Sequence, residues 1–137
     1  MTRPIKFALV FIGLTALTAL SPQARAEQQA PDYFIEVMFN TTTAERLAQF
    51  CPTVTVDSSH AQEQSEALVE RLGADGYGDV TDFGNLSGLE DGVAAMQVAF
   101  LEKHSIAGAG PDRVCEVAKE EIEGETSLGA FLVEIDG

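Results

Sequence analysis

Two cysteines, Cys51 and Cys115, are the only thiols of the 137-residue chain. Their spacing is too long for a Cys-x-x-Cys redox motif, and no second cysteine pair completes a zinc site. In an oxidising compartment, a lone pair of thiols is expected to form a disulfide. The chain-entropy model assigns such a bridge about 4 kcal/mol of stability for a loop of this length. We therefore predict a Cys51–Cys115 disulfide, with two buried free thiols as the alternative.

A glycine-rich loop from Asp79 to Glu90 is the best candidate for a cation site. Aligned with the twelve-residue calcium loop, Asp79 stands at position 1, Gly84 at position 6 and Glu90 at position 12. Phe83, at position 5, has no ligand atom, so the match is incomplete. Calcium binding is thus an alternative function. The competing interpretation is a loop in which Ser87 and Glu90 form a capping box for the following helix.

The other residue types that serve in catalysis form no known motif. His60 and His104 are the only histidines, and their spacing does not match a zinc hydrolase. The sequence has neither a Gly-x-Ser-x-Gly elbow nor a phosphate-binding glycine loop. A group of acids near the end of the chain is expected on a solvated helix end: Glu120, Glu121, Glu123 and Glu125. We therefore predict no catalytic residue and no cofactor, and an enzyme without a readable motif remains a third hypothesis.

Residues 1–26 have the pattern of a secretory signal peptide. Arg3 and Lys6 precede an apolar run, Phe7 to Leu20, that is short for a transmembrane helix. Ala24-Arg25-Ala26 then matches the small-x-small cleavage pattern. We expect cleavage and export to the periplasm, with an uncleaved anchor as the alternative.

The mature chain is strongly acidic. Loss of three basic residues with the leader changes the formal charge from −14 to −17. Such a chain repels nucleic acid and anionic membrane surfaces, because both bind positive surfaces. Glu63, Glu66 and Glu70 share one ridge of a predicted helix, where they are either solvated or contact a basic protein partner.

Hydrophobic spacing predicts an all-α fold, a small bundle of about five short helices closed by one disulfide. The run Thr41-Thr42-Thr43 is poor helix material, so we expect either one kinked helix or two short ones here. The only strand signals are Val54-Thr55-Val56 and the tail from Phe131 to Ile135. The helices are expected over 34–51, 58–72, 88–104 and 111–123, with a last short one from 126.

These helices are expected to form a single domain over residues 34–137, after a flexible lead-in over 27–33. Cys51 would lie in the last turn of the first helix, and Cys115 in the first turn of the helix that begins at Pro111. Both sulfurs would then close the bundle from inside. Four phenylalanines are expected in the core: Phe34, Phe39, Phe50 and Phe100.

Several short motifs resemble a family of small secreted proteins of Gram-negative bacteria whose function is unknown. The likeness covers most of residues 34–132, and the chain departs from the family in its many acids and its threonine run. It implies a helical periplasmic domain with two cysteines, and it carries over no activity. The matching pieces are Phe50-Cys51-Pro52, Leu72-Gly73, Gly76-Tyr77, Cys115, Glu121-Ile122 and Ser127-Leu128-Gly129.

The first functional hypothesis is therefore a non-enzymatic periplasmic domain that binds an unknown protein partner, as an accessory of an envelope or inner-membrane complex. It rests on the acidic composition and on the absence of a catalytic motif. No nucleic acid and no anionic membrane surface is expected among its partners.

Overall fold

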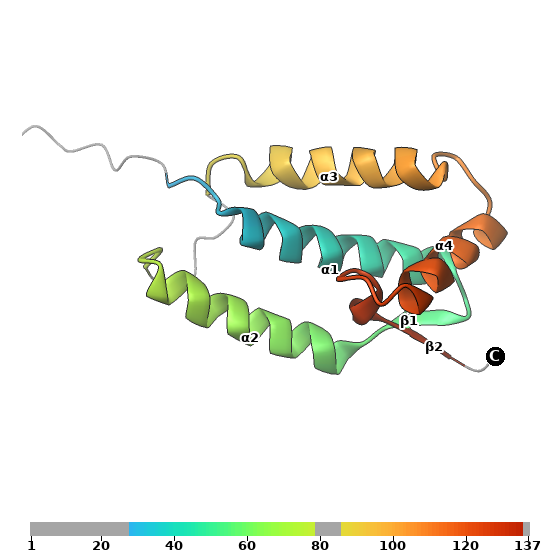
Figure 1. The fold of residues 1–137 in the computed structure, drawn as a ribbon, viewed down its shortest axis with the longest axis horizontal. Helices are drawn as coiled ribbons and strands as arrows, with labels where there is room; N and C mark the ends of the chain where they lie inside the picture. Colours follow the sequence, from blue (N-terminus) through green and yellow to red (C-terminus); the bar gives the residue numbers. More distant parts are fainter. Residues whose placement is uncertain (1–27, 79–85, 136–137) are drawn as a thin grey trace, which may run out of the picture.

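The computed structural model describes residues 28–78 and 86–135, which are mostly helical (Figure 1). Four α-helices make up most of this part of the chain: α1 (Asp32–Phe50), α2 (Ser58–Ala74), α3 (Leu89–His104) and α4 (Pro111–Glu123). In Figure 1, α1 lies between α3 and α2, and α4 packs against the far end of α1. No helix in the described ranges is both long and apolar enough to cross a membrane.

A small antiparallel sheet corrects the all-α prediction. Strand β1 (Val54–Val56) pairs with β2 (Leu132–Glu134), with Val54 opposite Glu134 and Val56 opposite Leu132. The last expected helix is only a 3₁₀ turn, η2 (Gly129–Phe131), directly before β2. The β-branched Val-Thr-Val stretch favours a strand, but three residues are stable only with a partner strand and core packing. The tail supplies that partner from far along the chain, which sequence spacing does not reveal.

Helix α1 runs without interruption through its threonines. Thr41 donates its hydroxyl hydrogen bond to the Val37 carbonyl at 2.9 Å, and Thr42 donates to the Met38 carbonyl at 2.8 Å. Hydroxyls that bond the preceding turn are compatible with a continuous helix. The two-helix alternative is therefore wrong.

The ends of α2 and α3 match the predictions in part. Asp57 caps α2 by accepting a hydrogen bond from the His60 amide at 3.0 Å, so the helix begins where the expected range 58–72 begins. It continues through Gly73 to Ala74, beyond the expected end. Helix α3 starts after Gly88, whose φ of 78° lies in the left-handed region, and not from a Ser87–Glu90 capping box.

The predicted disulfide lies in the main hydrophobic core. Cys51 caps the C-terminus of α1 and bonds Cys115 in α4, with an S–S distance of 2.11 Å and a Cα–Cα distance of 5.0 Å. Cys51 is fully buried. The bridge therefore joins α1 to α4 from within, across 64 residues of sequence. Around it lie the buried residues Phe39, Ala44, Leu47, Val54, Phe100, Ile106, Val117, Ala118, Leu128, Phe131 and Leu132.

A second, smaller core joins the N-terminus of α1 to the end of α2. Its buried members are Ala30, Phe34 and Leu72. Residues 28–31, within the expected flexible lead-in, form backbone contacts here: the Ala30 amide donates to the Ser87 carbonyl at 2.9 Å. The lead-in residues of the described chain thus contribute to packing.

Candidate functional site

The site residues expected from sequence do not form one site. Glu63, Glu66 and Glu70 are all exposed along α2, as a solvated ridge would be. Asp79 lies outside the described residues, and Glu90 is an exposed acid in the first turn of α3. Within residues 28–78 and 86–135, no three His, Cys, Asp or Glu side chains are placed to hold a metal ion.

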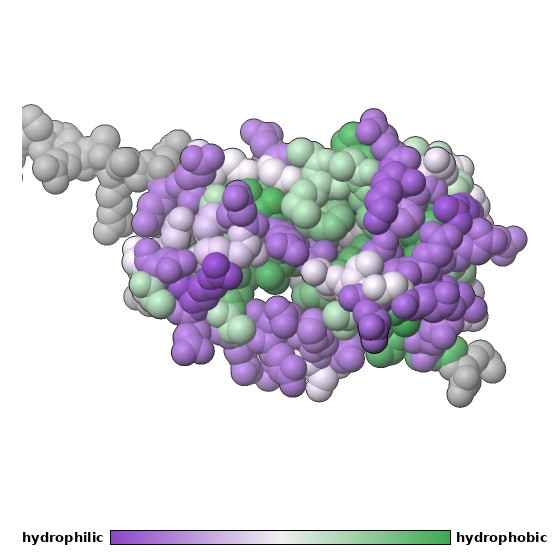
Figure 2. Space-filling view, in the orientation of Figure 1, coloured by the Kyte–Doolittle hydropathy of each residue, from purple (hydrophilic) through white to green (hydrophobic). Residues whose placement is uncertain are grey.

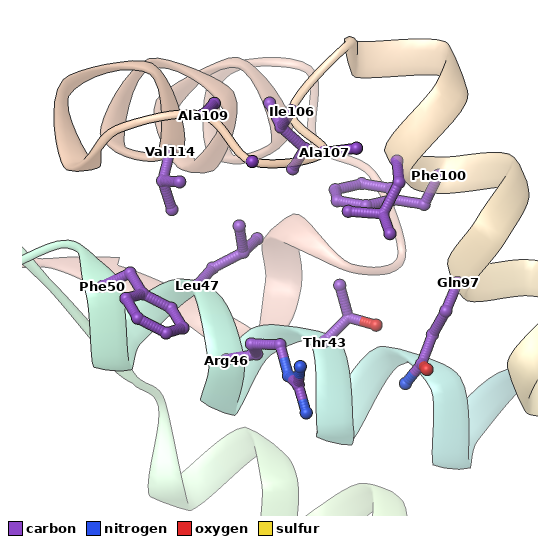
Figure 3. A pocket seen from close by; sticks show the side chains of 12 residues that line it. Thr43, Arg46, Leu47, Phe50, Gln97, Phe100, Ile106, Ala107, Ala109 and Val114 are labelled. Carbon is purple, nitrogen blue, oxygen red and sulfur yellow. The ribbon is translucent and has the colours of Figure 1, made fainter.

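The concave feature of the described surface is an apolar groove of about 460 Å³ (Figure 3). One wall is the C-terminal half of α1, the second is α3, and the segment between α3 and α4 forms the end. Volumes of roughly 300–1,000 Å³ are typical of small-molecule sites. Its lining residues are Thr43, Arg46, Leu47, Phe50, Gln97, Phe100, Leu101, Ile106, Ala107, Gly108, Ala109 and Val114.

Phe50, which the sequence analysis assigned to the core, lies on the rim of this groove. Its side chain is 55% exposed, whereas Leu47, one turn earlier, is buried. Cys51 leaves the helical conformation, with φ −117° and ψ 107°, so Phe50 is the last helical residue and points away from the packed interior. Leu101 of α3 is also exposed and lines the facing wall. The groove therefore presents apolar surface to water.

Three polar side chains interrupt the apolar lining: Arg46, Thr43 and Gln97. Thr43 is 7% exposed, and its hydroxyl oxygen has no hydrogen-bond partner in the described part of the chain. Gln97 donates to the Thr42 hydroxyl oxygen at 3.4 Å, which ties α3 to α1. Arg46 is exposed at the rim.

A buried polar cluster lies next to the groove, between the end of α3 and α4. His104 is 8% exposed and Glu121 is 5% exposed. His104 Nε2 is 2.9 Å from Glu121 Oε1, close enough for an ion pair, although its N–H bond is not directed at that oxygen. Thr126 donates a short hydrogen bond, 2.5 Å, to the other carboxylate oxygen of Glu121.

Arg113 and Glu120 complete the cluster on its exposed side. Arg113 Nη1 donates to Glu120 Oε1 at 3.0 Å, and its Nη2 donates to the His104 carbonyl at 3.1 Å. The hydrogen bond from Arg113 is the main reason that the pKa of Glu120 lies below its usual value. Glu120 Oε2 also lies 3.5 Å from His104 Nδ1, so the imidazole sits between two carboxylates.

The burial of Glu121 was missed by the sequence analysis, which placed this residue on a solvated helix end. The turn before η2 and the first residue of η2 fold over it: Gly129 packs so closely that a Cβ there would overlap the Glu121 carbonyl oxygen. The contacts that bury it come from Thr126 and Gly129, and neither residue identifies a buried acid in the sequence.

The cluster joins α3 to α4 through ionic and hydrogen-bond contacts. Both ring nitrogens of His104 face carboxylates, and neither His104 nor Glu121 lines the groove. The link between the two features is Phe100, whose ring lies 4.6 Å from that of His104 and which lines the groove wall. The cluster therefore fixes one wall of the groove.

Comparison with known proteins identifies a family without assigning an activity. No curated protein and no solved structure matches the chain. The model of a family of unknown function, DUF5333, matches residues 27–133. This range includes both cysteines, the whole groove and the buried cluster. The chain therefore belongs to DUF5333, a family of unknown function.

Proposed function

We propose that this chain is a non-catalytic binding domain of the periplasm and that the apolar groove between α1 and α3 is its binding site. The observation that carries the proposal is the exposed apolar lining, with Phe50 on the rim at 55% exposure. Apolar surface in water is unfavourable by about 25 cal/mol per Å², and a bound apolar group recovers that free energy. Exposed apolar patches with a polar surround commonly mark binding sites.

The periplasmic assignment is supported by two independent features. The Cys51–Cys115 disulfide is of a kind that persists in oxidising compartments. Residues 1–26 carry the signal-peptide pattern. A place beside an envelope or inner-membrane complex is compatible with both.

The described residues do not favour the two other hypotheses over binding. Calcium binding depends on Asp79, outside the described residues. His104 and Glu121, a buried pair of titratable groups, lie behind the groove wall and not in it.

Titration with N-phenyl-1-naphthylamine, a neutral apolar dye that brightens on leaving water, tests the groove. We expect saturable brightening with the full mature protein. Ala107→Trp places a large ring over the groove and should weaken dye binding at least about tenfold, because the site is then filled. Ala95→Trp, at an exposed α3 position outside the lining, is the matched control and should leave binding unchanged. Brightening that does not saturate, or that Ala107→Trp leaves intact, would contradict the proposal.

A further inference from the structure

We propose that the groove binds a small amphiphilic carboxylic acid, with its single carboxylate on Arg46 and its apolar body along Leu47, Phe50 and Val114. This inference rests on the proposed function of the groove as a binding site and names the class of molecule that it takes. Four observations support it. Polar and apolar side chains lie in different parts of the groove, and Arg46 has no ionic or aromatic partner in the described residues. The Thr43 hydroxyl has no hydrogen-bond partner there, and the net charge of the chain is strongly negative.

Polar and apolar groups are separated within the groove. Figure 3 shows Arg46, Thr43 and Gln97 along the side formed by α1 and its approach to α3. Phe50 and Val114 lie at the end of the groove away from Gln97, and the alanines of the segment between α3 and α4 lie across the groove from α1. A ligand that fills this space must itself be polar at one end and apolar along the rest.

Arg46 is the one basic side chain of the described residues that has no ionic or aromatic partner there. Arg71 stacks on the Tyr33 ring at 3.8 Å, and Lys119 pairs with Glu134 at 3.4 Å. Lys103 and Arg113 pair with acids of α4. In so acidic a chain, an unpaired guanidinium beside an apolar lining is available for an external anion. Its planar fork of N–H donors matches a carboxylate in a bidentate pair.

Thr43 supplies a second donor at the same end of the groove. The hydroxyls of Thr41 and Thr42 donate hydrogen bonds to backbone carbonyls of α1. The Thr43 hydroxyl, in contrast, is buried without a hydrogen-bond partner in the described chain. Threonine in a helix divides between two χ1 rotamers, so rotation about Cα–Cβ can turn this hydroxyl toward a bound headgroup. A buried hydroxyl left unpaired is costly, and a ligand oxygen relieves that cost.

Charge selects a carboxylate over a more highly charged headgroup. The formal net charge of the sequence is −14, so a second negative charge on a ligand meets repulsion that one arginine does not offset. A monovalent carboxylate is neutralised by Arg46 alone, whereas a phosphate monoester brings a charge of about −1.5 to −2 at neutral pH.

Displacement of the naphthylamine dye by dodecanoate, dodecanol and dodecyl phosphate, below their micelle concentrations, tests the class. Dodecanoate should displace the dye at a concentration about tenfold lower than dodecanol, as expected for a charge-assisted hydrogen bond. Arg46→Gln should remove this advantage, so that the ratio of the dodecanoate and dodecanol displacement concentrations, measured within the variant, falls to about one. Arg71→Gln is the matched control, because the Arg71 guanidinium already stacks on the Tyr33 ring. This variant should keep the advantage of about tenfold that dodecanoate has over dodecanol.

The outcomes separate this inference from the proposed function. If the dye binds and Ala107→Trp blocks it, but dodecanoate and dodecanol displace it equally, the groove is a binding site and the carboxylate class is wrong. An equal or stronger effect of dodecyl phosphate also overturns the class. A protein that dimerises in sedimentation and admits neither dye nor dodecanoate overturns both proposals, because the groove is then covered by a second copy.

Discussion

At the scale of single residues, three consecutive threonines of α1 have two different environments. Thr41 and Thr42 bond backbone carbonyls of the preceding turn, at 2.9 and 2.8 Å, and so remain satisfied within the helix. Thr43 faces the groove floor, with its hydroxyl unpaired in the described chain. A buried hydroxyl without a partner has lost its bonds to water and gained none in return. A ligand oxygen would supply the missing partner, as the proposed role of the groove requires.

Replacement of Thr43 by valine should stabilise the ligand-free protein. Valine has nearly the same shape and carries no unpaired oxygen, so we expect the free energy of unfolding to rise by about 1 kcal/mol. Thr41→Val is the matched control: it makes the same change in helix propensity but removes a satisfied hydrogen bond, and it should not stabilise. Urea unfolding of both variants measures the difference. A fall in the stability of Thr43→Val equal to that of Thr41→Val would show that the hydroxyl is already satisfied.

Glu121 shows what sequence spacing cannot reveal at this scale. The residue lies in a run of acids on α4, and every local signal favours a solvated position. It is buried because the turn before η2 packs over it and Thr126 donates to it. By contrast, the Asp57 cap and the disulfide were predictable, because a cap depends on residues three apart and two lone cysteines have only each other.

Truncation of Glu121 should therefore be costly. Glu121→Ala leaves His104 without its nearest carboxylate and Thr126 without its acceptor, and we expect a loss of about 3 kcal/mol in the free energy of unfolding. Glu123→Ala, an exposed acid on the same helix, should change stability by less than about 0.5 kcal/mol. Chemical denaturation measures the free energy of unfolding of the two variants. Equal values would show that Glu121 is solvated in the folded protein.

At the scale of elements, α2 is held mainly at its two ends. Leu72 is its only buried residue, whereas α1 has six. The C-terminal end of α2 is fastened to α1 by polar contacts: the Tyr33 hydroxyl donates to Asp75 at 2.7 Å, and Arg71 stacks on the Tyr33 ring. Figure 2 shows the exposed face of α2 as almost wholly hydrophilic. The middle of α2 is thus largely exposed, because its neighbours contact it mainly at the ends.

The Tyr33 contact makes this fastening dependent on pH. Burial, followed by the hydrogen bond to Asp75, raises the pKa of Tyr33 from 10.0 to about 12. The folded protein therefore holds the phenol proton more tightly than the unfolded chain. The stability from this contact is complete below pH 10 and is lost as the pH rises toward about 12.

Ultraviolet absorbance of the phenolate tests this assignment. The wild-type protein should show a titration step near pH 12 that is absent in Tyr33→Phe. Asp75→Asn should move that step to lower pH, because Asp75 contributes to the upward shift through its hydrogen bond and its charge. If the step stays in place in Asp75→Asn, the contact between the two helices does not form in solution.

At the scale of the whole molecule, the disulfide and the groove are parts of one arrangement. Cys51 follows Phe50, and Cys115 follows Val114; both preceding residues line the groove. The bridge therefore fixes the distance between two groove walls that are more than sixty residues apart in sequence. On the opposite side, the cluster of His104, Glu121 and Arg113 fixes the wall that α3 provides. The walls of the groove are thus held by the disulfide and by the polar cluster.

Loss of the bridge should therefore affect binding as well as stability. The double variant Cys51→Ser, Cys115→Ser frees the two chain segments in the unfolded state, and we expect it to lose about 4 kcal/mol of stability. It also removes the covalent link beside Phe50 and Val114, so naphthylamine binding should weaken even at temperatures where the variant remains folded by circular dichroism. Leu72→Ala is the reference for a general loss of stability, because it truncates a buried side chain of the second core, outside the groove lining. If the serine variant binds the dye as tightly as wild type while folded, the disulfide stabilises the domain without shaping the groove.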